Sequence, residues 1–211
     1  MARPQADPEI DLAFRAAEVW GLKVATMARL AALAVTSVWA LFATTGMVTV
    51  FVIGIMGLVA VNGMAHYALR RRSRSVVFAY LTVLVDVSLM AGAMFGWTYF
   101  GSPYLPAQMS LRDGLSVYFY ILIAVTGFSY MPSLTLWAGA CAAVAWMAGG
   151  IYLANLPDSL VVVDDLLPDV SAYLAVRLDP FYVDLYRVGQ DAVILMLVAA
   201  IASVAVARGR R

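Results

Sequence analysis

The stretch MVTVFVIGIMGLVAVNGMAHYALRRRSR, residues 47–74, carries the two signals that decide the fold. Its apolar part, residues 47–69, holds no charged side chain and is long enough to cross the hydrocarbon core of a bilayer as a helix. The cluster of Arg70, Arg71, Arg72 and Arg74 then stops the span, and such clusters remain on the cytoplasmic side. The stretch therefore predicts a transmembrane helix that ends in the cytoplasm.

The composition of the whole chain is that of a membrane protein. Of its 211 residues 64% are hydrophobic and 13% charged, and the mean hydropathy is +0.86. So few polar residues could not cover the surface of a folded chain in water. The net charge of +1 gives no indication of a nucleic-acid partner, and the basic clusters need no partner beyond anionic lipid headgroups. A single cysteine, Cys141, excludes an intrachain disulfide.

The basic residues give the orientation. Eleven of the fourteen fall into three clusters, which are Arg3, Arg15, Lys23 and Arg29; Arg70, Arg71, Arg72 and Arg74; and Arg208, Arg210 and Arg211. The other three, Arg112, Arg177 and Arg187, fall between spans, on the side where most of the acids lie. The positive-inside rule then predicts that both chain ends are cytoplasmic.

The hydropathy pattern predicts an all-α integral membrane protein with six transmembrane helices. They cover roughly residues 24–44, 47–69, 76–99, 115–130, 133–153 and 188–207. Five spans would require residues 115–153 to form one helix with Pro132 inside it. Residues 1–23 are expected to form an amphipathic helix along the inner headgroups, residues 24–207 the six-helix domain, and residues 208–211 the start of a cytoplasmic linker.

Two connections are expected on the outer side. Residues 100–114 contain Gly101, Pro103, Pro106 and two charges, a composition typical of a loop. Residues 155–186 form an acidic outer cap with six aspartates and Arg177. Their apolar residues predict one or two short amphipathic helices over the outer mouth of the bundle, broken at Pro168 and Pro180.

Asp86 is the most informative single residue because it lies about ten positions into the third span, near the bilayer middle. A carboxylate at that depth costs roughly 2.5 to 3.5 kcal/mol, so Asp86 is expected to face the bundle interior and to be protonated or paired. It is a ligand contact, proton site or switch, or it is a structural group bonded to a neighbouring helix, and both interpretations stay open. Arg29 lies near the inner end of the first span, from where it can snorkel.

His66, the only histidine, lies one turn before Arg70, and its imidazole is expected to form hydrogen bonds with water or a lipid headgroup. The chain offers no cysteine or second histidine to complete a zinc or haem site, although a symmetric dimer would supply a second His66. No metal, cofactor or catalytic residue is therefore predicted. Ser129 lacks a base within reach, and Lys23 lies outside the bundle, which disfavours a protease and a retinal Schiff base.

Two further patterns concern packing and binding. Gly92 and Gly96 make a small-residue ridge on the third span, for which packing within the chain is favoured over a dimer interface. Tyr118 belongs to a group of aromatic residues near the outer mouth. An aromatic belt at the membrane surface is favoured over the lining of a pocket for an amphipathic ligand.

The chain resembles, over nearly its whole length, the membrane region of bacterial class III adenylate or guanylate cyclases. The resemblance lies in hydrophobic motifs without a catalytic signature, and their residues are these: Ala28-Arg-Leu-Ala-Ala-Leu-Ala-Val, Val38-Trp39, His66-Tyr67, Tyr118-Phe119, Phe128-Ser-Tyr-Met-Pro, Leu136-Trp-Ala-Gly, Ala145-Trp146, and Asp179-Pro with Asp184 and Arg187. In that family a six-helix region is followed by a helical linker and a cytoplasmic cyclase domain that works as a dimer.

The resemblance implies that this chain is the sensor and anchor half of such a protein, in a bacterial inner membrane. Arg208-Gly-Arg-Arg resembles the start of the linker, and no catalytic residue can be carried over. The resemblance also implies a homodimer. Asp86, His66, Arg29 and Tyr118 are the candidates for a ligand or switch site, with an unidentified small molecule or lipid as ligand. The alternatives are a small transporter or channel and a purely structural anchor.

Overall fold

A computed structural model describes residues 8–43, 46–72, 76–96, 106–112, 114–162 and 169–209, and the regular elements within these ranges are all helices. The expected all-α fold is confirmed. One isolated parallel bridge joins Leu160 to Tyr182. The elements are α1 (Pro8–Ala43), α2 (Met47–Arg72), α3 (Val76–Gly96), the 3-10 helix η2 (Ala107–Leu111), α4 (Val117–Gly127), α5 (Pro132–Ala154), α6 (Val170–Leu178) and α7 (Leu185–Gly209).

Five of these helices are long and apolar enough to cross a membrane: α1 over residues 20–42, α2, α3, α5 and α7. Their bounds follow the predicted spans within a few residues, because a helix in lipid must satisfy every backbone group internally. The fourth predicted span differs. In the described residues α4 has 11 residues, which is about 17 Å at 1.5 Å per residue and too short for the hydrocarbon core.

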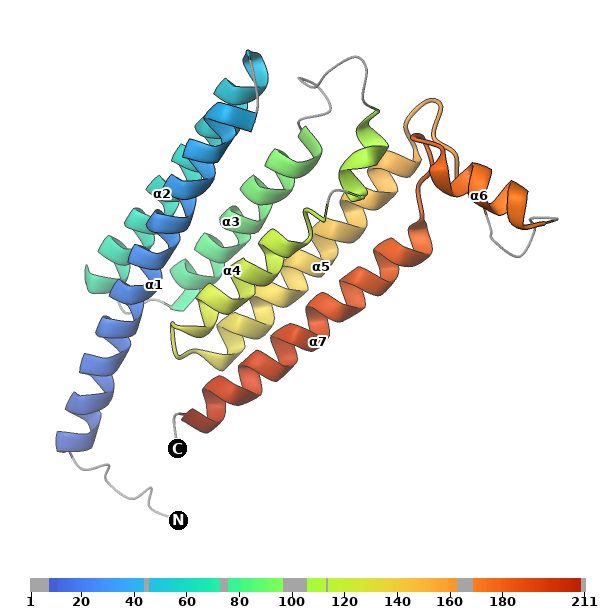
Figure 1. The fold of residues 1–211 in the computed structure, drawn as a ribbon. Coiled ribbons are helices and arrows are strands. Elements are labelled where there is room, and N and C mark those ends of the chain that lie inside the picture. The colour runs from blue at the N-terminus through green and yellow to red at the C-terminus, as the bar shows by residue number, and fades with distance from the viewer. Residues whose placement is uncertain are drawn as a thin grey trace.

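A second short helix, η2, precedes α4 in the chain. Figure 1 shows η2 above α4, and both run beside α5. Gly114, with φ of +67°, makes the turn between them. Gln108 and Ser110 are buried, and Gln108 Nε2 donates a hydrogen bond to Ser159 Oγ at 2.7 Å. Residues 106–112 of the predicted outer loop therefore pack against the bundle, while residues 100–105 and 113 of that loop lie outside the described residues.

The N-terminal segment is part of α1. Residues 8–43 form one helix of 36 residues, without a break between the predicted amphipathic part and the first span. Figure 1 shows α1 continuing past the neighbouring helices along one axis. That residues 1–23 lie along the inner headgroups stays a prediction; residues 1–7 lie outside the described residues, and from Pro8 the chain runs into the first span as one helix.

The bundle consists of two groups of helices. In the first, α1 packs on α2 and α2 on α3; in the second, α5 packs on α7 and α4 on both. The groups meet mainly where α3 packs on α5, while α1 and α4 contact each other little. At this junction Trp146 of α5 is 1% exposed and lies 5.8 Å from the Phe95 ring and 6.3 Å from the Phe119 ring, measured between centroids.

Small residues bring α5 close to its neighbours. A Cβ on Gly139 would overlap the Cβ of Ala199 on α7, and a Cβ on Gly149 would overlap the Phe95 ring on α3. Gly150 similarly leaves room for Val188 of α7. The small-residue face of this helix therefore serves close helix packing within the chain, which van der Waals contact stabilises in lipid.

The described beginning of α1 and the end of α7 lie at the same end of the bundle, and α6 lies at the other (Figure 1). α6 begins after Asp169, whose side chain accepts a hydrogen bond from the Ala172 N–H at 2.8 Å, and it ends before Pro180. One helix of the predicted acidic cap is thus present. It has no buried residue and projects beside the bundle rather than over it, while residues 163–168 lie outside the described residues.

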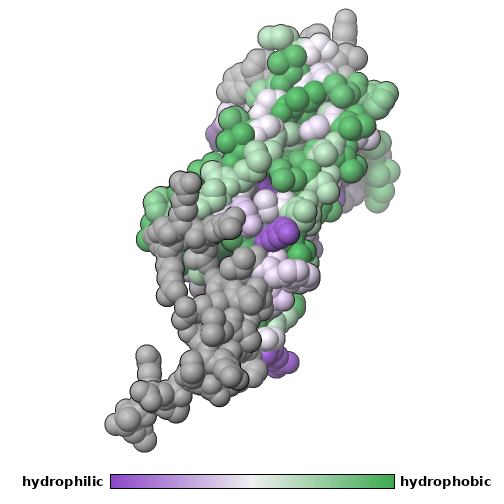
Figure 2. All heavy atoms as spheres, turned by 90° about the vertical axis from the view of Figure 1, so that its left-hand side faces the viewer, coloured by the Kyte–Doolittle hydropathy of each residue, from purple (hydrophilic) through white to green (hydrophobic). Residues whose placement is uncertain are grey.

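The outer surface is apolar where lipid is expected. Figure 2 shows hydrophobic residues over most of the described upper part of the face made by α1 and α2. The exposed apolar side chains of α1 and α2 include Val35, Trp39, Phe42, Val50, Leu58 and Val61. Such a continuous apolar surface is typical of a protein that is solvated by lipid tails.

Candidate functional site

The centre of the first helix group holds an ion pair between Arg29 of α1 and Asp86 of α3. Both terminal nitrogens of the guanidinium donate to the carboxylate, Nη1 to Oδ2 and Nη2 to Oδ1. The side chains are 14% and 3% exposed. This two-pronged arrangement is the strongest geometry open to an arginine and a carboxylate, and it joins two helices that are not neighbours in the chain.

Asn62 of α2 completes the polar centre, by which we mean Arg29, Asn62 and Asp86. Its Nδ2 donates to Asp86 Oδ1 at 2.6 Å and to the Thr82 carbonyl oxygen at 3.0 Å. Each of the first three helices therefore contributes one side chain. Because an unsatisfied polar group in lipid costs several kcal/mol, roughly 2 to 7 by transfer measurements, the network fixes how the three helices face one another.

The backbone of α2 shapes the site around the guanidinium. Nη2 of Arg29 also donates to the Val59 carbonyl oxygen at 2.7 Å. Gly63, one turn further along the same face of α2, has no side chain, and a Cβ there would lie 3.1 Å from Arg29 Nε. Val59, Asn62 and Gly63 follow the i, i+3, i+4 spacing of one helix face, which explains how one helix supplies all three contacts.

These contacts settle two expectations. Asp86 faces the interior and is paired, as predicted. Arg29 does not snorkel, because its guanidinium turns into the bundle and bonds to Asp86. Pairing is favoured over snorkelling because the attraction between the two charges offsets part of the cost of burying them, whereas snorkelling would leave Asp86 with the Asn62 amide alone.

His66 lines a small cavity directly beside the polar centre. The His66 cavity has a volume of about 60 Å³, and its other polar lining residues are Thr26, Arg29, Asp86, Thr126 and Ser129. Thr126 and Ser129 come from the second helix group, at the end of α4. The cavity therefore brings a titratable side chain, the ion pair and both helix groups together.

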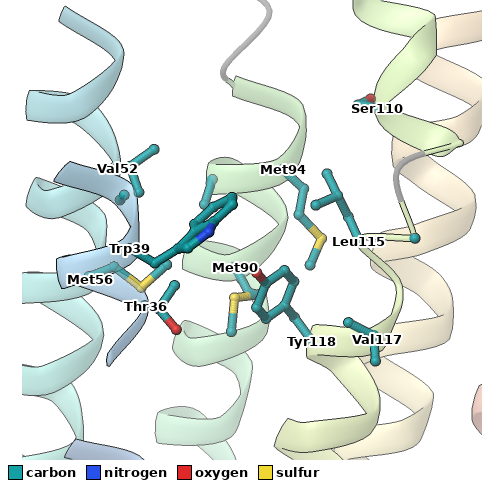
Figure 3. Close-up of a pocket in the computed structure, with 13 residues that line it drawn as sticks. Thr36, Trp39, Val52, Met56, Met90, Met94, Ser110, Leu115, Val117 and Tyr118 are labelled. Carbon is teal, nitrogen blue, oxygen red and sulfur yellow. The ribbon is translucent and has the colours of Figure 1, made fainter. Parts of the chain in front are cut away.

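Tyr118 lines a larger cavity on the other side of the polar centre. The Tyr118 cavity has a volume of about 400 Å³ and lies between α1, α2, α3 and the α4 segment. Figure 3 shows Trp39 and Tyr118 pointing into it from opposite sides, with Met90 between them. Its lining is mainly apolar and includes Met56 and Met94. Its hydroxyl groups belong to Thr36, Ser110 and Tyr118. This size and chemistry suit an apolar ligand that carries one hydrogen-bonding group.

A third cavity lies between these two. It has a volume of about 80 Å³ and shares Arg29 with the His66 cavity and Tyr118 with the Tyr118 cavity. Most of its other lining is aliphatic, including Ala32, Leu33 and Val59. The three cavities follow the boundary between the first helix group and α4, so the two groups are loosely packed on this side and tightly packed at α3 and α5.

The two glycines of α3 behave differently. A Cβ on Gly96 would lie 3.0 Å from Phe51 Cζ, so Gly96 serves the packing of α3 on α2. Gly92 is exposed, and a Cβ there would meet nothing within 4 Å. The predicted packing within the chain therefore holds at Gly96 and not at Gly92.

The sequence indicated several residues of the site but not which of them contact one another. Asn62 was not among the candidate site residues, and Arg29 was not joined to Asp86, although both of these charged residues lie within predicted spans. Among the described residues, no group of three His, Cys, Asp or Glu side chains could hold a metal ion. Comparison of the chain with protein-family models, curated proteins and solved structures gives no match. The function therefore has to be argued from the geometry of the site.

Proposed function

We propose that the chain is a membrane sensor and anchor domain that regulates a cytoplasmic class III nucleotide cyclase joined to the end of α7. The domain would lie in a bacterial inner membrane, cross it six times with both ends in the cytoplasm, and act as a homodimer. The identity of the effector rests on the sequence resemblance. The sensing role rests on the geometry of the polar centre and the cavities beside it.

The arrangement of the chain ends supports six crossings. α1 begins and α7 ends at the same end of the bundle, which requires an even number of passes. Five helices are long enough to cross, and η2 with α4 runs beside α5 as a sixth, discontinuous segment. The turn at Gly114, which is exposed, separates η2 from α4, so the sixth crossing would consist of two short helices.

The single observation that carries the proposal is the ion pair of Arg29 and Asp86 beside the loosely packed boundary between the two helix groups. A buried pair of this kind is stable when intact and costly when one partner is lost, by about 3 to 5 kcal/mol. Such a contact favours discrete arrangements over continuous deformation. It therefore suits a domain that changes between two states.

A ligand in the Tyr118 cavity would act on this boundary. The cavity touches α1, α2 and α3 on one side and the α4 segment on the other, and α4 packs on α7. A ligand that fits one arrangement of the two groups better than the other shifts their equilibrium by its difference in affinity. α7 belongs to the second group and leads to the end of the chain where an effector would follow.

Filling the cavity by mutation tests the proposal without knowledge of the ligand. A cyclase catalytic domain is fused after Arg211, and cyclic nucleotide output is measured in membranes for wild type and Ala93→Phe, which adds a ring to the cavity wall. Ala31→Phe, at an exposed position of α1, is the matched control. We expect Ala93→Phe to change output at least about fivefold and the control to leave it unchanged. Equal output from all three folded proteins would contradict a sensing role.

The homodimer is tested separately. Crosslinking of the fusion in membranes at native density should give dimers, because class III cyclase active sites form between two subunits. A population of monomers alone would count against the cyclase assignment. The rival function, a transporter, would need a polar path across the bundle. The mainly aliphatic lining of the third cavity, between the His66 cavity and the Tyr118 cavity, argues against such a path.

A further inference from the structure

The three arginines outside the basic clusters converge on one cavity. Arg112 follows η2, Arg177 lies on α6 and Arg187 is in the first turn of α7, and all three line a cavity of about 160 Å³. This arginine cavity lies at the end of the bundle opposite the described chain ends. The sequence does not predict that these side chains lie together, since they come from three separate segments of the chain.

Aromatic rings hold two of the guanidiniums in place. The Tyr182 ring, 4% exposed, lies 5.9 Å from Arg112 Cζ and 5.5 Å from Arg177 Cζ, measured to the ring centroid. Arg177 also lies 5.2 Å from the Tyr173 ring and forms an ion pair with Asp184. Side chains fixed in this way lose little further freedom when a ligand binds, so the site is preorganised.

The charges of the cavity leave one cation in excess. Among the described residues, its wall holds three guanidiniums against two carboxylates, Asp184 and Asp191. Asp184 is engaged by Arg177 and by the Arg187 backbone N–H at 2.9 Å, and Asp191 lies one turn beyond Arg187 and interacts with its charge. The carboxylate of Asp179, outside the wall, accepts from the Phe181 N–H at 2.8 Å.

Donors also outnumber acceptors there. Among the described residues, the Arg112 guanidinium donates only to the backbone carbonyl oxygens of Asp179 and Tyr182, the latter at 3.2 Å. Trp146 lines the same cavity, and its indole N–H is buried without a hydrogen-bond partner among the described residues. A ligand that only accepts hydrogen bonds and carries negative charge would match both imbalances.

We propose that the arginine cavity binds a small oxyanion, with carboxylate or phosphate oxygens held by Arg112 and Arg187. The oxyanion is either a free solute or the phosphate of a lipid headgroup, and both present the same oxygens. Bound there, it would join the segment after η2 to the first turn of α7. The site uses none of the residues of the polar centre, and its test requires no effector domain, so its outcome is separate from that of the sensing role.

Binding is measured on the purified chain in zwitterionic phosphatidylcholine nanodiscs. Inorganic phosphate and succinate are titrated by calorimetry and by thermal unfolding, with sodium chloride at matched ionic strength as the reference. We expect saturable binding to wild type that weakens about ten- to a hundredfold in Arg187→Gln and in Arg112→Gln, as for the loss of a charged hydrogen bond. Arg187 is exposed, so its substitution preserves the fold. Arg208→Gln, exposed at the other end of α7, should bind like wild type.

A second set of nanodiscs identifies the source of the oxyanion. With phosphatidylglycerol added, stabilisation of wild type but not of Arg187→Gln, and no further effect of phosphate, would assign the site to a lipid headgroup. Saturable binding of phosphate or succinate that phosphatidylglycerol does not prevent would assign it to a solute. The proposal is overturned if neither probe nor lipid stabilises wild type beyond sodium chloride, or if Arg112→Gln and Arg187→Gln bind as tightly as wild type.

Discussion

Arg29 and Asp86 are 57 residues apart in the sequence, and each terminal nitrogen of the Arg29 guanidinium bonds to one carboxylate oxygen of Asp86. The two side chains are 14% and 3% exposed, so the pair is largely enclosed by the helices around it. Neither residue could hold its position alone, so the contact explains how an otherwise apolar set of three helices acquires one defined arrangement.

The first prediction concerns the energy of this pair. Arg29→Met or Asp86→Leu alone leaves an uncompensated buried charge and should lower the free energy of unfolding by about 3 to 5 kcal/mol. The double variant removes both charges and should recover most of that loss, since apolar residues can replace a buried pair at little cost. Denaturant unfolding in micelles measures all three. A double variant that loses the sum of the two single effects would show that the residues are not coupled.

Gly63 provides a second prediction, with a control on the same helix. A Cβ at Gly63 lies 3.1 Å from Arg29 Nε, so Gly63→Ala should push the guanidinium from Asp86 and destabilise the fold by about 1 to 3 kcal/mol. Gly57 is exposed with nothing within 4 Å, so Gly57→Ala should be neutral or stabilise by up to about 1 kcal/mol. Equal unfolding energies for the two variants would rule out the close approach at Gly63.

The third prediction tests the packing of α5 on α7. Gly139→Ala places a methyl group where the Cβ of Ala199 lies, and overpacking of this kind costs about 1 to 3 kcal/mol. Ala199→Gly in the same chain removes the obstructing methyl and should restore most of the stability. Melting temperatures of the single and double variants measure the effect. Absence of rescue would mean that the two helices do not meet at these residues.

Asp169 gives a prediction for pH. Hydrogen bonds from the Ala172 backbone N–H and the Ser171 hydroxyl hold the pKa of the exposed Asp169 carboxyl below its ordinary value of 3.8. A folded-state pKa below the unfolded value stabilises α6 at every pH above that ordinary value, and the effect is lost as the pH falls through the lowered pKa. Amide exchange in α6, followed by NMR against pH, should show this loss. Asp169→Asn still caps the helix and should abolish its dependence on acid.

Hydropathy predicted the long helices closely because lipid permits little else. Residues 47–69 lie within α2, and the spans before and after end within a few residues of the helices. The fourth span was predicted to cover residues 115–130, whereas α4 ends at Gly127. The sequence did not predict that the segment around Gln108 packs against the bundle. Gln108 and Ser110 look like loop residues because their polar groups are counted as if exposed. Only the structure shows that Ser159 and the Ala107 carbonyl satisfy them.

The site was predicted as residues and not as an arrangement. Asp86 was expected to need a partner, and Arg29 was the basic residue furthest inside a span, yet the sequence does not state which helices are neighbours. The arginine cavity was beyond prediction for the same reason. Arg112, Arg177 and Arg187 belong to segments far apart in the chain, and their convergence depends on where Tyr182 is buried.

The most direct test of the sensing role is the cyclic nucleotide output of a cyclase domain fused after Arg211, compared between wild type, Arg29→Gln, Asp86→Asn and the double variant. If the polar centre controls the state of the bundle, each single variant changes output at least about fivefold in the same direction, and the double variant returns toward wild type. Melting temperatures and expression in the same membranes show that the proteins are folded. Wild-type output from all three folded variants would contradict the account and leave the chain as an anchor.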